Sequence, residues 1–313
     1  MIKLESKTLT AHIIPYGATL AGLWHRDTAN SLVLGSPEAD AYADALSYCG
    51  AIVGPVANRI ARAKIDVGGS QWSMQANEGE NCLHSGSSGV HAKDWRVSDL
   101  SATSVTLTLQ LPHGDGGLPG NRSLIARYQV TDTSFLNLAM RVYSDADTAI
   151  NLAHHPYWNL DSSATISDHL LQVHAERYLP VNAQLLPTGQ IASVGGSRYD
   201  FRSPRAVPTN FALDNNFCLS EKSLKIPELA ATLTGSSGVA MRIETTEPGL
   251  QVYNGSGLGA VSWPMHDSRK LQPHAGIALE PQGWPDAPHH PRFPQIWLRA
   301  GETYRQETRY HIS

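Results

Sequence analysis

The chain has 313 residues, of which 41% are hydrophobic and 17% charged, with 24 lysines and arginines against 28 aspartates and glutamates. This composition supports a sizeable core and excludes intrinsic disorder as the main state. The formal net charge of −4 indicates no concentrated basic face for nucleic acid, and no apolar run approaches the ~18–20 residues that cross a bilayer. We therefore expect neither a nucleic-acid nor a membrane partner.

The N-terminus and the cysteines bear on the cellular compartment. Residues 1–5 read MIKLE and lack the apolar stretch of a signal peptide. The three cysteines, Cys49, Cys82 and Cys218, form no CxxC pair and are odd in number. We expect reduced, buried thiols rather than a disulfide, and a cytoplasmic location.

The first third of the chain carries short structural signals. Alternating apolar and polar residues predict strands at 11–14, 20–24 and 65–74. Between them, Ser36-Pro37 has the pattern of an N-cap followed by proline at the first helical position, which predicts a short helix over 37–46.

Three longer segments follow with a clear period of two. In 104–111 (SVTLTLQL) every second residue is apolar, and 123–130 and 135–142 also place apolar residues on one face. The last two segments flank the polar turn 131–133, which predicts an antiparallel hairpin.

The second half of the chain continues with short strands. They are predicted at 170–175, 239–245, 250–254, 276–282 and 304–311, with one weaker helix signal at 222–231. The 26 glycines and 19 prolines are spread along the chain, as expected of many turns, and no linker or internal repeat is visible. We therefore predict an all-β protein, one large antiparallel domain over residues 1–313 with few short helices.

The segment 151–160 (NLAHHPYWNL) distributes its polar side chains unusually. If it is extended, one face gathers two amides with the imidazole of His155 and the phenol of Tyr157. The other face is apolar apart from His154. A solvated face usually carries Lys, Glu and Thr, whereas this mixture suits a concave site that hydrogen-bonds a polyol. A structural histidine in a polar network remains the alternative.

The segment 276–282 (GIALEPQ) behaves similarly. Glu280 and Gln282 share one face of an otherwise apolar strand. A buried glutamate is costly unless it is hydrogen-bonded or paired, so Glu280 is expected to have partners. A structural ion pair is the alternative to a functional carboxylate.

Most standard catalytic signatures are absent from the sequence. It contains no GxxxxGK[ST] phosphate loop, no HExxH zinc helix and no GxSxG nucleophile elbow. The 14 histidines include doublets at 154–155 and 289–290, but neighbouring strand residues point to opposite faces and rarely supply two ligands to one ion. We expect no metal and no organic cofactor.

A series of short motifs runs in order along nearly the whole chain. The main ones are PYGA at 15–18, ANRI at 57–60, LH at 83–84, HPYWNL at 155–160, PTG at 187–189, DNNF at 214–217, QVY at 251–253, LEPQ at 279–282 and PDA at 285–287. Each is weak alone. In this number and order they resemble the aldose 1-epimerase (galactose mutarotase) family.

The resemblance implies a β-supersandwich, a domain of antiparallel sheets with a sugar-binding cleft. It also implies interconversion of the α- and β-anomers of a free aldose without a cofactor. In that family the histidine of HxYxNL is the general acid and the glutamate of LEPQ the general base, here His155 and Glu280. Arg59, His84 and Asp214 occupy the positions of residues that bind sugar hydroxyls.

Three more residues are predicted to contact the sugar. Asn58 precedes the arginine of ANRI, and Tyr157 and Gln282 lie on the same faces as the acid and the base. The chain departs from the family pattern at Pro55, where arginine is common, and at Ser85, where glycine is common. The second departure adds a hydroxyl close to the expected cleft and leaves the sugar specificity open.

The chemistry fits these residue types. Mutarotation removes a proton from the anomeric hydroxyl and delivers one to the ring oxygen, which suits a carboxylate (reference pKa ~4.3) and an imidazole (~6.5). Because each charge favours the ionised form of the other, we expect the pKa values of Glu280 and His155 to lie further apart than these reference values.

Three alternative functions remain open at this point. A hexose-6-phosphate mutarotase needs clustered cations near the cleft, and Arg59, Arg62 and Lys64 are the candidates. A non-catalytic sugar-binding module does not need the acid and base that this chain retains. A glycoside hydrolase needs two carboxylates that flank the glycosidic oxygen, and it leaves the histidine without a leading role.

Overall fold

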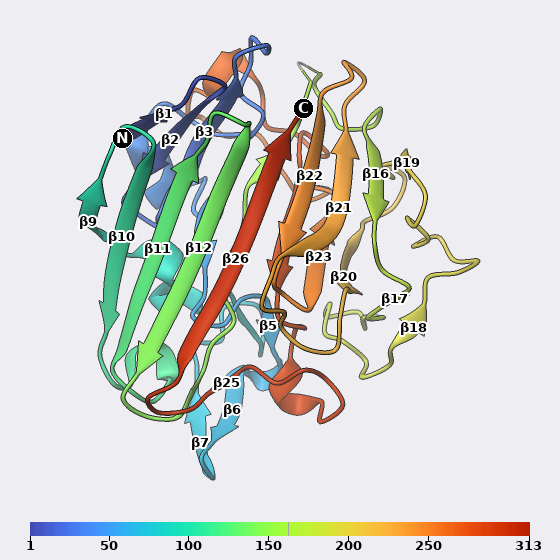
Figure 1. The fold of residues 1–313 in the computed structure, drawn as a ribbon. Helices are drawn as coiled ribbons and strands as arrows, with labels where there is room; N and C mark the ends of the chain where they lie inside the picture. Colours follow the sequence, from blue (N-terminus) through green and yellow to red (C-terminus); the bar gives the residue numbers. More distant parts are fainter. Residues whose placement is uncertain (162) are drawn as a thin grey trace.

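Antiparallel strands make up most of the regular structure in the computed structural model, which describes residues 1–161 and 163–313. The largest sheet has nine strands and dominates the view in Figure 1. In spatial order they are β19 (Arg205–Ala206), β16 (Leu170–Val173), β21 (Glu228–Thr234), β22 (Ala240–Thr245), β26 (Thr303–Ile312), β12 (Phe135–Ser144), β11 (Arg122–Val130), β10 (Ser104–Leu111) and β9 (Arg96–Leu100). The predicted all-β class is confirmed.

A second sheet of six strands carries much of the candidate site. Its spatial order is β15 (Tyr157–Trp158), β24 (Ile277–Gln282), β23 (Gly249–Tyr253), β20 (Asp214–Cys218), β17 (Arg177–Tyr178) and β18 (Ala192–Ser193). The N-terminal strands form a third sheet of β1 (Ile2–Glu5), β2 (Leu9–Ile14) and β3 (Thr19–His25).

The remaining elements are short. Four strand pairs are β13 (Thr148–Ala149) with β25 (Trp297–Leu298), β14 (Ala153–His154) with β4 (Ile52–Val53), β5 (Arg59–Ile60) with β8 (Cys82–Leu83), and β6 (Lys64–Val67) with β7 (Ser70–Ser73). The helices in the described residues are 3-10 turns: η1 (Ala39–Ala43), η2 (Ala61–Ala63), η3 (Gly86–Ser88), η4 (Val90–Ala92), η5 (Asp115–Gly117), η6 (His266–Ser268) and η7 (Ala287–His289). Among the described residues no helix is long and apolar enough to span a membrane.

The main core lies between the sheets because strand alternation sends one face of each strand inward. Leu107 of β10 and Leu138 of β12 are fully buried there together with Val252 of β23 and Leu279 of β24. The predicted hairpin is confirmed, since β11 pairs antiparallel with β12. All three cysteines are free and buried, as expected.

Three sequence-based predictions of local structure differ from the structure. The helix predicted over 37–46 is only the 3-10 turn η1. The strand predicted over 65–74 is a hairpin, β6 and β7, which turns at Gly68 and Gly69 with positive φ values of 60° and 79°. The helix predicted over 222–231 is wrong, because its second half begins β21, whose pairing with β16 and β22 overrides its weak helical preference.

The segment 151–160 is extended but interrupted at Pro156, which has no N–H group to donate to a ladder. Its two histidines nevertheless point to opposite sides, as predicted. His154 is buried in the core, where its Nδ1 lies 3.1 Å from the hydroxyl of Tyr310. His155 faces the cavity described below.

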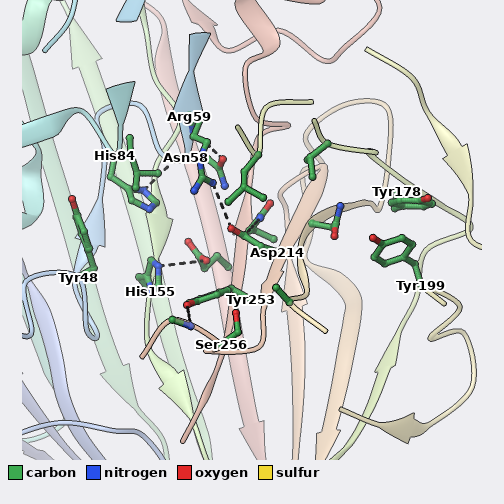
Figure 2. A pocket seen from close by; sticks show the side chains of 18 of the residues that line it. Tyr48, Asn58, Arg59, His84, His155, Tyr178, Tyr199, Asp214, Tyr253 and Ser256 are labelled. Carbon is green, nitrogen blue, oxygen red and sulfur yellow. Dashed lines mark hydrogen bonds and ion pairs between the residues drawn. The ribbon is translucent and has the colours of Figure 1, made fainter. Parts of the chain in front are cut away.

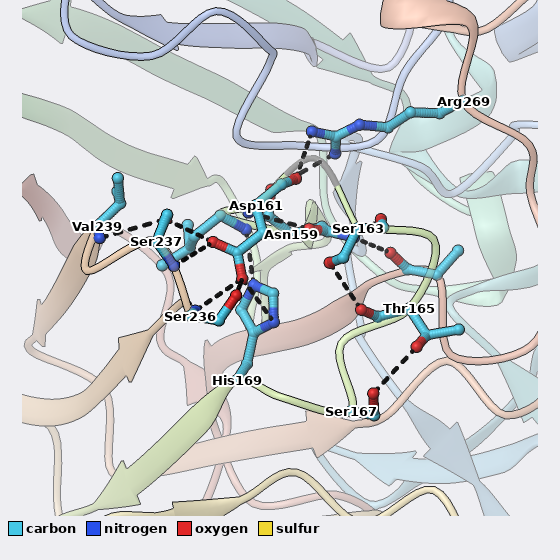
Figure 3. Close-up of polar contacts among 12 residues, drawn as sticks. Asn159, Asp161, Ser163, Thr165, Ser167, His169, Ser236, Ser237, Val239 and Arg269 are labelled. Atoms are coloured by element: carbon cyan, nitrogen blue, oxygen red, sulfur yellow. Dashed lines mark hydrogen bonds and ion pairs between the residues drawn. The ribbon is translucent and has the colours of Figure 1, made fainter.

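A cluster of hydrogen bonds around Asp161 fixes the chain just after β15 (Figure 3). The carboxylate of Asp161 accepts four hydrogen bonds, from the backbone N–H and the hydroxyl of both Ser236 and Ser237, at 2.5–3.1 Å. Burial alone raises the pKa of Asp161, but these hydrogen bonds outweigh it and lower the pKa to about 2. Arg269 donates to the backbone oxygen of Asp161 at 2.8 Å. These hydrogen bonds therefore connect the segment after β15 to the turn between β21 and β22.

Candidate active site

A cavity of about 550 Å³ opens beside the six-stranded sheet (Figure 2). Its lining draws on parts of the chain that lie far apart in sequence. The polar and aromatic lining residues include Tyr48, Asn58, Arg59, His84, His155, Tyr157, Tyr178, Arg198, Tyr199, Asp214, Gln251, Tyr253 and Glu280.

Strand register places one wall of this cavity. Glu280 of β24 lies opposite Gln251 of β23, and Tyr253 of β23 lies opposite Asp214 of β20. The neighbours of Glu280 and Gln251 along each strand, such as Leu279, point into the core. Alternation therefore gathers a carboxylate, an amide, a phenol and a second carboxylate on one surface.

The opposite wall depends on unusual backbone conformations. Asn58 and His84 have positive φ values of 62° and 52°. The backbone N–H of Asn58 donates to Nδ1 of His84 at 3.1 Å, and the N–H of His84 donates to the backbone oxygen of Asn58 at 3.0 Å. Because Nδ1 accepts a hydrogen bond, a neutral His84 carries its proton on Nε2. His84 is therefore a hydrogen-bond donor through Nε2.

Arg59 is held by two carboxylates. Its Nε and Nη2 donate to Glu78 at 2.6 and 2.9 Å, and its Nη1 lies 3.5 Å from Asp214. Burial lowers the pKa of Arg59, but the hydrogen bonds to Glu78 and the charges of both carboxylates outweigh it, and the net change is upward. Arg59 is thus a fixed cation, with Asp214 also tied to Nε2 of Gln251 at 2.5 Å.

His155 and Glu280 face each other across the cavity floor. Nε2 of His155 lies 3.6 Å from Oε1 of Glu280, and both side chains are buried. Among the described residues, Nδ1 of His155 and Oε2 of Glu280 have no hydrogen-bond partner. The pair is therefore positioned by packing and is free to exchange protons with a ligand.

The pKa values of this pair shift opposite to the sequence-based expectation. Burial lowers the pKa of His155 to about 4. Burial also raises the pKa of Glu280 well above its ordinary value, with the charge of Asp214 adding to the rise and that of Arg59 opposing it. Desolvation is the largest cause of both shifts, and it favours the uncharged form of each group, a neutral imidazole and a protonated carboxyl.

Seven of the eight predicted site residues line the cavity. The exception is Gln282, which is fully buried outside the described lining and has neither amide atom hydrogen-bonded. The Ser85 hydroxyl also lies elsewhere than expected, because it donates to the backbone oxygen of Val56 at 3.1 Å and accepts from its N–H at 3.0 Å. Its contribution is to hold the backbone, so its effect on the cleft is indirect.

Sequence reasoning missed several lining residues. Gln251 and Tyr253 lay within a recognised motif, QVY, without an assigned role. Tyr48 had no signal, yet its ring lies 5.1 Å from that of His84 and 6.3 Å from that of His155. Glu78 is not among the lining residues, and only its contact with Arg59 connects it to the site, since no local pattern marks it.

One cluster in the cavity has the composition of a metal site. Single ligand atoms of His84, His155 and Glu280 lie within 4.8 Å of one another. Zinc needs an unprotonated imidazole nitrogen from each histidine and three or four protein ligands. The Asn58 amide places the proton of His84 on Nε2, which leaves two ligands and a hydrogen-bond donor. This donor set fits a sugar hydroxyl better than a metal ion.

Comparisons with known proteins give matches over nearly the whole chain. The family model described as aldose 1-epimerase matches residues 1–311. Mouse galactose mutarotase is 34% identical, over 99% of this chain and 93% of the mouse protein. Aldose 1-epimerase of Escherichia coli K12 is 30% identical, over 96% of this chain and 91% of that protein.

Solved structures give the same result. An aldose epimerase homologue from C. elegans superposes with a TM-score of 0.91 at 30% identity, covering 100% of this chain and 98% of that chain. Galactose 1-epimerase from Lactobacillus acidophilus gives 0.87 at 25% identity, covering 99% and 93%. This chain belongs to the aldose 1-epimerase family.

Proposed function

We propose that the protein is a mutarotase that interconverts the α- and β-anomers of a free aldose by acid–base ring opening and closure. The observation that carries this proposal is the His155–Glu280 pair, 3.6 Å apart in a buried cavity lined with hydrogen-bonding groups. The family's full-length match supports the same reaction. Catalysis needs only these side chains, and we propose no metal or organic cofactor.

In ring opening, the carboxylate of Glu280 takes the proton of the anomeric hydroxyl while protonated His155 gives a proton to the ring oxygen. The aldehyde then rotates about its C1–C2 bond and closes from the other face, with the two groups in exchanged roles. The open-chain aldehyde thus coexists with neutral His155 and protonated Glu280. Burial favours this neutral pair before ring opening too, so the ionised pair that starts the step must first form by transfer of the proton from Glu280 to His155.

The sugar ring is proposed to be held by the fixed polar groups around the pair. Arg59 and Asp214 supply a donor and an acceptor that are already oriented by their ion pair. Nε2–H of His84 supplies a second donor, and Asn58 and Tyr157 border the same space. We retain Gln282 only as a predicted contact, because it lies outside the cavity lining.

A free aldose is favoured over a sugar phosphate. Arg59 is already neutralised by Glu78 and Asp214. Neither Arg62 nor Lys64 is among the described residues that line the cavity. Arg198 also lines the cavity, but it is exposed and donates to the hydroxyl of Tyr199 at 2.9 Å. One exposed arginine beside a neutralised one is not the cation cluster that a phosphate dianion needs.

We also propose that residues 1–313 act as one domain, which the match over residues 1–311 supports. A cytoplasmic location remains our proposal, and it is supported by the three free, buried thiols.

Polarimetry on freshly dissolved α-glucose, α-galactose, L-arabinose and xylose tests the function. The wild type should speed equilibration of at least one of them, and His155→Ala and Glu280→Gln should each lose at least ~10²-fold, the usual contribution of one proton-transfer group. His154→Ala is the matched neighbour and should affect stability more than rate, because His154 faces the core. Wild-type rates equal to buffer for all four sugars would reject the proposal.

A further inference from the structure

A second cavity, of about 410 Å³, has no lining residue in common with the first. It lies between the β22–β23 connection, β25 and the start of β26. Apolar residues such as Ile150 and Leu298 contribute to its wall, with the rings of Trp297 and Tyr304. Nothing in the proposed mutarotation uses this space.

The buried carboxyl group of Glu247 lines this cavity. Glu247 is only 2% exposed, and its Oε1 has no hydrogen-bond partner among the described residues. Burial raises the pKa of Glu247 to about 8. A buried carboxyl oxygen without a hydrogen-bond partner destabilises the fold. A ligand that donates a hydrogen bond to it, or carries a positive charge, removes this cost when it binds.

Three other polar side chains that line this cavity already have hydrogen-bond partners. The Asn151 amide oxygen accepts from the N–H of Gly283 at 2.7 Å, and Nε2 of Gln295 donates to three backbone oxygens at 2.9–3.1 Å. The Tyr304 hydroxyl donates to Gln306 at 2.7 Å. Among the described residues that line this cavity, Glu247 is a buried charged group that can still recognise a ligand.

These features restrict the ligand class. A single carboxylate cannot supply the 6–8 oxygen ligands of Ca²⁺, and it repels anions. A neutral sugar needs several free hydrogen-bonding groups, which the occupied amides do not provide. A compact organic cation needs only one counter-ion, an apolar wall and an aromatic ring. That is what Glu247, Ile150 and Trp297 offer.

We propose that this second cavity binds a small organic ammonium ion, with the Glu247 carboxylate as its counter-ion and its alkyl part against the apolar wall. The site is independent of the sugar cavity and of the proposed mutarotation. Other charged groups reach only the rim, where Glu221, Lys222, Glu302 and Arg305 are exposed and therefore screened.

Titration calorimetry of the full-length protein with n-butylammonium chloride tests this site. We expect saturable binding at pH 9, at least tenfold weaker in Glu247→Gln, and no comparable binding of the neutral isostere 1-butanol. Affinity should rise from pH 7 to pH 9, because Glu247 ionises in this interval while an alkylammonium (pKa ~10.4) stays charged. Glu302→Gln, on the rim, should bind as the wild type does.

Two further controls separate the possible outcomes. Glu280→Gln should retain binding, and its loss there would place the cation in the sugar cavity instead. Equal binding of butylammonium and butanol by the wild type would overturn the proposal without relying on any variant. The absence of binding heat when butylammonium is titrated into the wild type at pH 9 would overturn it too. Near-ultraviolet circular dichroism of Glu247→Gln checks that its loss of binding does not reflect loss of the fold.

Discussion

The ion pair between Glu78 and Arg59 gives the sharpest test of how the sugar cavity is organised. Glu78→Gln keeps the shape of the side chain and removes its charge. The arginine then loses the partner that fixes its Nε and Nη2, and it is free to turn towards Asp214 and Glu280. Since Arg59 is proposed to hold the sugar in both ground and transition states, KM should rise more than kcat falls.

The size of this effect follows from the contact and its exposure. Two unit charges ~4 Å apart attract by about 4 kcal/mol at an effective dielectric constant of ~20. The side chain of Glu78 is 37% exposed, against 8% for Arg59, so solvent screens part of this attraction. Exposed pairs contribute only ~0.2–1 kcal/mol. An intermediate loss of about 1–2 kcal/mol corresponds to a rise in KM of ~5- to 30-fold.

Polarimetry over a range of sugar concentrations measures this rise in KM. Glu80→Gln is the matched control, because Glu80 is exposed two residues away on the same turn. Glu78→Asp, which restores the charge, should recover part of the affinity. An unchanged KM in Glu78→Gln would refute the idea that this carboxylate positions Arg59.

Three other predictions follow from the site and its surroundings. The pH profile of kcat/KM should be bell-shaped, with its acid limb near pH 4, where the imidazole of His155 becomes protonated. Asp214→Asn should move the alkaline limb to lower pH, because the charge of Asp214 raises the pKa of Glu280. An alkaline limb that stays in place in this variant contradicts this electrostatic account. Asp161→Asn should lower the free energy of unfolding by about 2 kcal/mol at pH 6. Because the pKa of Asp161 in the folded protein is depressed to about 2 from 3.8, the difference from wild type should vanish as pH falls through this interval. Denaturant unfolding at pH 6 and pH 2 measures this difference, and an equal difference at both pH values contradicts a stabilising role of the ionised carboxylate. Chelator should leave mutarotation intact, and activity that disappears in EDTA and returns with zinc would contradict the proton assignment of His84.

The sequence was informative wherever a period of two was combined with a chemical motif. The opposite directions of His154 and His155 followed from alternation alone, and they hold even though Pro156 interrupts the strand. Arg59 and Asp214 were placed by the motifs around them. Both line the cavity, and their contacts with a sugar stay a prediction that rests on the family resemblance.

Other features depend on contacts that the sequence does not reveal. Glu78 is an ordinary acidic turn residue until Arg59 lies beside it. The pKa values of His155 and Glu280 shift opposite to the expected direction because burial, which no motif encodes, is the largest cause of both shifts. The segment after 222 was misjudged because its pairing partners are distant in sequence.

The position of β26 also has a consequence for how this chain is made. Residues Thr303–Ile312 form the fifth of nine strands in spatial order, with four strands on each side. The two halves of the sheet are therefore connected only through β26, which is the last strand in the sequence. During synthesis, the edges of β12 and β22 stay unpaired until these residues leave the ribosome. A nascent chain that stops short of residue 303 exposes two long strand edges, each a template for aggregation. Completion of the large sheet therefore waits for residues 303–312.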